Sequence, residues 1–161
     1  LDDSDEAITI THDEQQILMQ VGEVELVSRL IEGAYPDYRK LIPTKFAVSA
    51  SLKRDDLTNI TKVSSLFARE SAGSVTIKVD EASKLVSIRS VASQLGENTA
   101  SASAEVSGSG EVTLNSRYLL EALHVFNGDT VTFSFNGKLE PCLLTDPKAK
   151  DYKHIIMPLR S

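Results

Sequence analysis

A short stretch bounded by two prolines divides this sequence into two unequal parts. Pro36 and Pro43 each fix their own φ angle and bias the preceding residue toward extended backbone. Glycine and serine are absent between them, so residues 35–43 predict an ordered, extended connector rather than a flexible one. The fold must therefore accommodate a short first part, residues 1–34, and a long second part, residues 44–161.

The first part predicts three strands and no helix. Residues 6–11 alternate between apolar and polar side chains, and residues 16–21 and 23–30 continue as two further strands. A three-stranded meander leaves one face bare, which a complete domain avoids. We therefore expect residues 1–34 to be the closing strands of a domain whose beginning lies elsewhere.

The second part alternates between strand and helix patterns. Strands are expected at residues 45–52, 75–79, 86–88, 100–106, 112–114, 131–135, 139–144 and 152–159. Apolar side chains recur at helical spacing over residues 53–69, and again from a cap at Asn115 or Ser116 to about Phe126. Asn136-Gly137 predicts a tight hairpin turn. This order predicts an α+β fold in which two helices pack on an antiparallel sheet.

A weak internal repeat links the two parts. Residues 7–11 resemble residues 130–134, and each segment is followed by a predicted hairpin and then a third strand. The first part is therefore expected to be the end of a domain of the same kind as residues 44–161.

Composition restricts the classes of function. The net charge of −6 is unevenly divided, because residues 1–32 carry nine acids and one base while residues 33–161 carry fourteen acids and sixteen bases. The single cysteine excludes an internal disulfide and suits a reducing compartment. The sequence contains no apolar run of about eighteen residues, so no membrane span is predicted. The histidines lack metal-ligand spacing and no glycine-rich phosphate loop is complete, so neither metal nor cofactor is expected.

Catalysis would depend on Cys142. The nucleophile would need His124 or His154 as its base, yet Cys142 lies in a predicted strand without a local nucleophile motif. A buried or edge thiol with a structural role is the favoured interpretation. A small hydrolase is the remote alternative.

Three short motifs resemble one protein family. They are Tyr-Pro-Asp-Tyr-Arg-Lys-Leu-Ile-Pro at 35–43, Leu-Asn-Ser-Arg-Tyr-Leu-Leu-Glu-Ala-Leu at 114–123 and His-Ile-Ile-Met-Pro-Leu-Arg-Ser at 154–161. They resemble the interdomain connector, the last-helix entry and the terminal strand of the bacterial DNA polymerase III β subunit, the sliding clamp. The resemblance implies a C-terminal fragment, with strands of clamp domain 2 over residues 1–34, the connector, and clamp domain 3 over residues 44–161.

The same resemblance implies a non-catalytic, cytoplasmic processivity factor of the replicative DNA polymerase. The full-length protein would encircle duplex DNA as a homodimeric ring, contacting phosphates without reading bases. Its other partners would be the polymerase subunit, the clamp loader and repair proteins, with no membrane. Basic residues implied to face DNA are Lys53, Arg54, Lys62 and Arg117. Without the resemblance, these would be expected to form an ordinary solvated face. Leu66 and Phe67 are implied to form the ring interface.

A peptide-binding groove is implied as well. Its residues come from the connector, the last hairpin and the C-terminal tail: Pro36, Lys40, Leu41, Leu139, Pro141, Ile155, Met157, Pro158, Leu159 and Arg160. Methionine and leucine give an adaptable apolar floor, and proline withholds a backbone N–H. The alternative function is a peptide-binding adaptor of similar α+β architecture that does not bind DNA.

Overall fold

The structure is a computed structural model, and it describes residues 7–35, 37–93, 96–149 and 152–160. The chain folds as two compact units, a first unit of Leu1–Asp37 and a second unit of Tyr38–Ser161. No helix among the described residues is long and apolar enough to cross a membrane.

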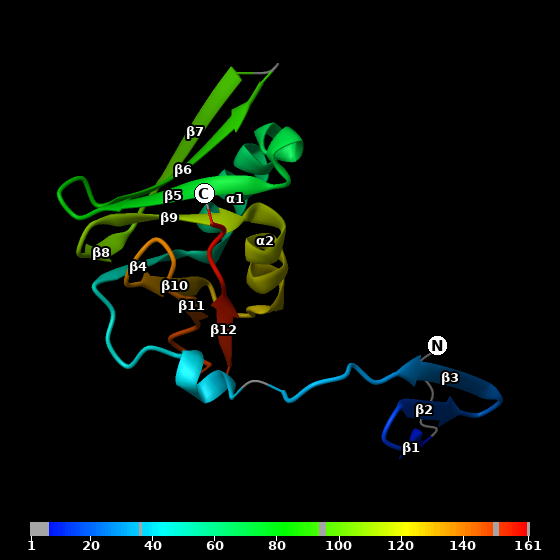
Figure 1. The fold of residues 1–161 in the computed structure, drawn as a ribbon. Coiled ribbons are helices and arrows are strands. Elements are labelled where there is room, and N and C mark those ends of the chain that lie inside the picture. Colours follow the sequence, from blue (N-terminus) through cyan, green and yellow to red (C-terminus); the bar gives the residue numbers. More distant parts are fainter. Residues whose placement is uncertain (1–6, 36, 94–95, 150–151, 161) are drawn as a thin grey trace. The chain divides into compact units, whose positions relative to one another are not determined.

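The first unit is a three-stranded antiparallel sheet. Its strands β1 (Thr9–His12), β2 (Gln16–Val21) and β3 (Val24–Arg29) pair in sequence order, as expected (Figure 1). Neighbouring side chains of β3 point to opposite faces of a sheet. Leu26 and Val27 are both 59% exposed, so within this unit apolar side chains remain uncovered on both faces.

The described residues of the second unit form two antiparallel sheets, two helices and two 3₁₀ helices (Figure 1). One sheet has the order β12-β11-β10-β4-β8 and the other β7-β6-β5-β9. The strands are β4 (Val48–Lys53), β5 (Ser74–Asp80), β6 (Leu85–Ala92), β7 (Gly96–Ser103), β8 (Glu105–Ser107), β9 (Gly110–Asn115), β10 (Thr130–Phe135), β11 (Cys142–Thr145) and β12 (Lys153–Ile156). The helices are η1 (Tyr38–Leu41), α1 (Arg54–Phe67), η2 (Arg69–Ser71) and α2 (Ser116–Val125).

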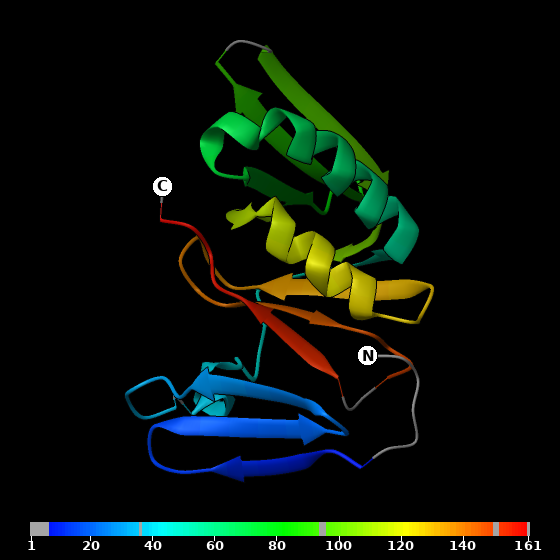
Figure 2. The same ribbon diagram turned by 90° about the vertical axis from the view of Figure 1, so that its right-hand side faces the viewer.

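One core joins both sheets and both helices. Along β5, Val75, Ile77 and Val79 are buried, while Thr76 and Lys78 lie on the other face of the strand. The same alternation runs along β4, β6 and β9. Figure 2 shows α1 and α2 side by side against the sheets, with α1 packed on β6 and β7. The α+β prediction is therefore confirmed.

The second helix forms as its sequence predicts. Asn115 is the N-cap, because its side chain accepts a hydrogen bond from the backbone N–H of Arg117. The predicted buried stripe is confirmed, since its four members each have an exposed fraction of 2% or less: Leu119, Ala122, Leu123 and Phe126.

The first helix is shorter than predicted. It begins at Arg54, so Lys53 is the last residue of β4, and it ends at Phe67, so Arg69 belongs to η2. The chain then reverses through Ala72 and Gly73, both with positive φ. The helical pattern over residues 53–69 overestimates the length because 3₁₀ and α-helical spacing are alike over a few residues.

The expected strand at 100–106 is two strands in different sheets. β7 ends at Ser103 and β8 begins at Glu105, while the backbone N–H of Ala104 donates to the carbonyl of Lys84 at 3.0 Å. The side-chain alternation continues through the change of sheet. For that reason the sequence pattern contains no mark of it.

Two connections also differ from expectation. Residues 38–41 of the connector form a 3₁₀ helix rather than extended backbone. The hairpin after β10 has a loop of residues 136–141 instead of a two-residue turn, and Gly137 lacks the positive φ of such a turn. The Asn136 side chain instead accepts from the N–H of Ala47 and donates to the carbonyl of Lys45. This asparagine thus holds the segment leading into β4.

Candidate functional site: the helix face and the C-terminal strand

A hollow of about 720 Å³ lies between the two helices. Its lining residues are Arg54, Asp55, Thr58, Lys62, Leu120, Glu121, Leu123 and His124. Two of the predicted DNA-facing residues, Arg54 and Lys62, therefore come together here. They share the hollow with two carboxylates, so its charge is mixed rather than uniformly basic.

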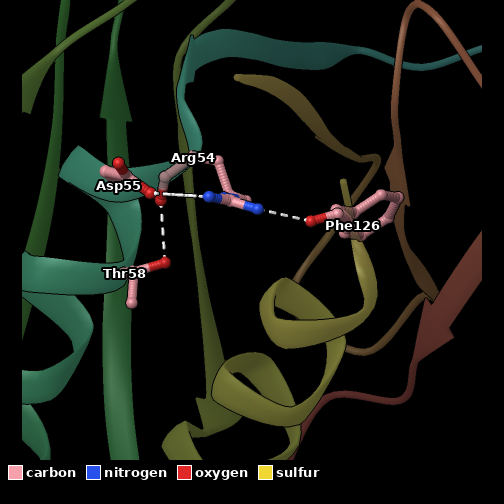
Figure 3. Close-up of polar contacts among 4 residues, drawn as sticks. All are labelled: Arg54, Asp55, Thr58 and Phe126. Atoms are coloured by element: carbon pink, nitrogen blue, oxygen red, sulfur yellow. Dashed lines mark hydrogen bonds and ion pairs between the residues drawn. The ribbon is translucent and has the colours of Figure 1, made fainter. Parts of the chain in front are cut away.

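The guanidinium of Arg54 is bonded to two other residues of the chain, Phe126 and Asp55 (Figure 3). Its Nη1 donates to the carbonyl of Phe126 at 2.6 Å, at the end of α2. Its Nη2 lies 3.1 Å from Oδ1 of Asp55, and the side chain is only 29% exposed. The guanidinium thus connects the start of α1 to the end of α2, where backbone carbonyls lack helical partners.

The other three predicted DNA-facing residues are exposed but differ in their contacts. Arg117 Nε lies 2.8 Å from Glu121 Oε1, one helical turn along α2, and this contact raises the pKa of the guanidinium. The ammonium groups of Lys53 and Lys62 have no hydrogen-bond or ion-pair partner among the described residues. Lys53 lies beside a different hollow, formed with the β5–β6 turn.

The predicted ring-interface pair lies at the end of α1. Leu66 is 53% exposed, whereas Phe67 is half-buried. Leu57 and Ile60 are the apolar residues of α1 that enter the core. Leu66 is therefore available as a surface contact, and Phe67 only in part.

Two predicted groove residues meet in a small hollow of about 300 Å³ between α2 and β12. It is lined by Tyr118, Glu121, His154, Ile155, Ile156 and Met157. Met157 is 54% exposed. Among its described residues, the tail beyond Met157 makes one such backbone bond, from the N–H of Leu159 to the carbonyl of Thr113 at 2.9 Å.

Ile155 also lines a larger hollow of about 850 Å³ beside η1. The other lining residues are Tyr38, Arg39, Ile42, Pro43, Thr44, Phe46, Leu143, Tyr152 and Lys153. Lys40 and Leu41 are exposed on η1 but line neither hollow.

The remaining described groove residues line none of these hollows. Leu139 is 63% exposed in the loop before β11, and Pro141 directly precedes that strand. The tail residues Pro158 and Leu159 are half-buried and Arg160 is exposed. Pro36, the first predicted groove residue, lies outside the described residues.

Sequence reasoning missed four residues of the small hollow, namely Tyr118, Glu121, His154 and Ile156. Tyr118 and Glu121 occupy exposed positions of α2, one helical turn apart, and could have been identified from the helical period. His154 accepts or donates one hydrogen bond, between its Nδ1 and the hydroxyl of Tyr152 at 2.9 Å. Partial burial lowers the pKa of His154, which favours the neutral ring, while Glu121 opposes that shift.

Cys142 cannot act as a nucleophile here. The side chain is fully buried, and burial raises the pKa of the thiol to about 12. The reactive thiolate is therefore negligible at neutral pH. Among the described residues, no group of three His, Cys, Asp or Glu side chains could hold a metal ion.

Comparison with known proteins gives one consistent family. Residues 39–160 match the family described as DNA polymerase III beta subunit, C-terminal domain. The chain is 30% identical to the beta sliding clamp of Staphylococcus epidermidis and 31% identical to that of Staphylococcus aureus. In both cases the match covers the whole chain but only 43% of the relative's length.

Solved structures give the same result. The DNA polymerase sliding clamp from Bacillus subtilis is 28% identical with a TM-score of 0.79, over 100% of this chain and 43% of that one. The DNA polymerase III subunit beta from Pseudomonas aeruginosa shares the fold, with a TM-score of 0.81 at 21% identity, over 99% of this chain and 44% of that one. The chain therefore belongs to the DNA polymerase III β subunit family, the family of the bacterial sliding clamps.

Proposed function

We propose that this chain is the C-terminal part of a sliding clamp, a non-catalytic processivity factor of the replicative DNA polymerase. Residues 1–34 would close clamp domain 2, residues 35–43 would be the connector, and residues 44–161 would be domain 3. The observation that carries the proposal is the family match over residues 39–160, on a fold that presents two adjacent helices with basic side chains.

The helix face is proposed to contact duplex DNA. Lys62 lines the inter-helix hollow and Lys53 stands at the start of α1, each without an ion-pair partner among the described residues. Ammonium groups bind phosphates as point charges and do not select a base sequence. Such contacts are weak, salt-sensitive and uniform along the duplex, which a ring that slides requires.

The surface of β12 and η1 is proposed to receive an apolar peptide segment. Met157 and Ile155 form part of an apolar floor beside Tyr118. Leu41 is 41% exposed and directly precedes Ile42, which lines the hollow beside η1. Peptide affinity in such grooves depends on a few buried anchors. The partners would be the polymerase subunit, the clamp loader and repair proteins carrying a short apolar motif.

DNA encirclement is tested with the full-length protein of which this chain is proposed to be a part. After loading, the protein should be retained on nicked circular DNA and lost when the circle is linearised. Equal retention on both forms would contradict a topological link. Absence of any DNA retention, together with peptide binding, would favour the adaptor alternative.

Peptide binding is tested by fluorescence polarisation with a labelled peptide of the Gln-Leu-x-Leu-Phe type. The chain should bind saturably, and Leu41→Ala and Met157→Ala should each weaken binding about tenfold, the effect of losing about 1.4 kcal/mol. Val125→Ala, at a 53% exposed site on α2, is the matched control and should leave the affinity unchanged. If the full-length protein does not bind the peptide in this assay, the proposed groove is wrong.

A further inference from the structure

The hollow beside Lys53 brings together two lysines that are distant in sequence. It has a volume of about 520 Å³ and lies where the end of β4 meets the β5–β6 turn. The lining residues are Ser51, Leu52, Lys53, Ser83, Lys84, Ser103, Ala104, Glu105 and Thr130. It therefore combines two ammonium groups with four hydroxyls and one carboxylate.

Neither lysine is neutralised by a neighbour. In the described part of the chain, the ammonium groups of Lys53 and Lys84 have no hydrogen-bond or ion-pair partner, and both residues are exposed. This distinguishes them from the two arginines of the helix face, which bind Asp55 and Glu121. The positive charges of Lys53 and Lys84 are therefore available to a ligand.

The backbone holds both lysines in place. Lys53 is opposite Thr130 in the β4–β10 ladder. The carbonyl of Lys84 accepts from the N–H of Ala104, and the preceding turn is closed by Asp80 Oδ1, which accepts from the N–H of Ser83 at 3.0 Å. This hydrogen bond lowers the pKa of Asp80, so the turn persists with an ionised carboxylate at neutral pH. Only the side chains need to be ordered when a ligand binds.

Lys84 occupies its position at an energetic cost. Its φ is +55°, in the left-handed region that disfavours residues other than glycine and asparagine. A glycine would make this turn with less strain.

We propose that Lys53 and Lys84 together bind one backbone phosphate of the encircled duplex. The contact surface thereby extends beyond the helices onto the β5–β6 turn. This inference rests on the proposed DNA-binding function and adds Lys84 to it. Hydroxyls of Ser83 and Thr130 supply neutral donors beside the two charges, and Glu105 at the rim limits the affinity.

The test measures how duplex binding depends on salt. Anisotropy of a labelled duplex is titrated with the full-length protein at several salt concentrations, since each phosphate neutralised contributes about 0.9 to the log–log slope. Lys84→Gln should reduce the slope by about that amount. Lys84→Arg should restore it, and Lys148→Gln, which makes the same charge change on an exposed loop residue, should leave it intact.

A shared phosphate makes a further demand. In the double variant Lys53→Gln with Lys84→Gln, the loss of slope should be smaller than the sum of the two single losses. Lys84→Gly removes the charge while relieving the positive φ, so it should bind DNA as weakly as Lys84→Gln without loss of stability.

The outcomes distinguish failure of the Lys84 phosphate contact from failure of the proposed DNA-binding function. If Lys84→Gln and Lys148→Gln have the same slope while the parent protein binds DNA, the phosphate contact is wrong and the clamp proposal stands. If inorganic phosphate displaces no DNA, and the losses of slope in the two single variants add fully in the double variant, then Lys53 and Lys84 do not bind the same phosphate. If the parent protein shows no salt-dependent DNA binding, the proposed function itself fails.

Discussion

Arg54 has structural contacts that the sequence does not reveal. Counted as a base on a helix, it predicts a phosphate contact, but its guanidinium is already bound to the Phe126 carbonyl and to Asp55. A charge-assisted hydrogen bond of this kind contributes roughly 2 kcal/mol. Arg54→Ala should therefore lower the free energy of unfolding by about that amount in urea denaturation.

Arg117→Ala is the matched comparison for that measurement. Its pair with Glu121 is exposed and one helical turn long. Such exposed pairs are screened by solvent and contribute little to stability, so Arg117→Ala should destabilise the protein less than Arg54→Ala. Equal destabilisation by the two variants would show that the bond from Arg54 to the end of α2 contributes nothing special.

Cys142 gives a pH-dependent prediction with a definite sign. Burial raises its thiol pKa from 9.0 to about 12, so the unfolded chain loses this proton before the folded chain does. The stabilising contribution is complete below pH 9 and is lost as pH rises toward 12. In that window the free energy of unfolding should fall by about 1.4 kcal/mol per pH unit more than in Cys142→Ala. Denaturation midpoints of both proteins at pH 8 to 11 provide the check, and parallel curves would refute it.

At the level of elements, the junction after α1 is linked to the start of α2 by hydrogen bonds. The N–H of Gly73 donates to the carbonyl of Ala68, and its own carbonyl accepts from Ser116, the first residue of α2. The Asn115 side chain closes the junction by donating to the carbonyl of Ala72. Ala72 makes this reversal with a φ of +53°.

Relief of that angle should stabilise the protein. Ala72→Gly removes a left-handed penalty of roughly 1 kcal/mol and should raise the urea midpoint. Gly73→Ala should do the opposite, because its φ is +80° and a Cβ there would lie 3.1 Å from Asn115 Oδ1. Destabilisation by Ala72→Gly would mean that the junction does not limit stability.

Element types were predictable where the apolar period was long. The stripe of α2 and the alternation along β5 each determine one buried face, and the structure has both. The division at Ala104 was not predictable, because alternation is a property of one strand and the choice of partner sheet depends on distant residues. The loop after β10 was mispredicted for a similar reason, since Asn136 bonds to residues before β4.

At the scale of the whole molecule, the family and the fold class could be predicted from three short motifs, and both are confirmed. The site was less predictable. Helical position alone brings Arg54 and Lys62 to one hollow, but it cannot show that Asp55 neutralises Arg54. The meeting of Lys84 with Lys53 at one hollow could not be predicted, because a lysine in a turn has no periodic signal and the two residues are far apart in the sequence.

Assembly of the proposed ring can be tested at Leu66. Leu66 is 53% exposed, so Leu66→Asp should leave the stability of the 161-residue chain within about 0.5 kcal/mol. In the full-length protein the same change should place an unpaired charge in an apolar contact and shift the molecule to monomers. Light scattering reports the mass, with Val125→Asp on α2 as control. A Leu66→Asp protein that stays dimeric would remove Leu66 from the proposed interface.

The pairing of β4 with β10 has a consequence for how the chain is made. β4 contributes three buried side chains, Val48, Ala50 and Leu52, and its neighbours β8 and β10 both come later in the sequence. During synthesis at about 5–20 residues per second, β4 emerges several seconds before β10. The sheet of β5, β6, β7 and β9 can close on α1 meanwhile, since all its strands are adjacent in sequence or nearly so. Until residues 130–135 have been synthesised, β4 therefore lacks its β10 partner, and one side of its hydrogen-bonding ladder stays open.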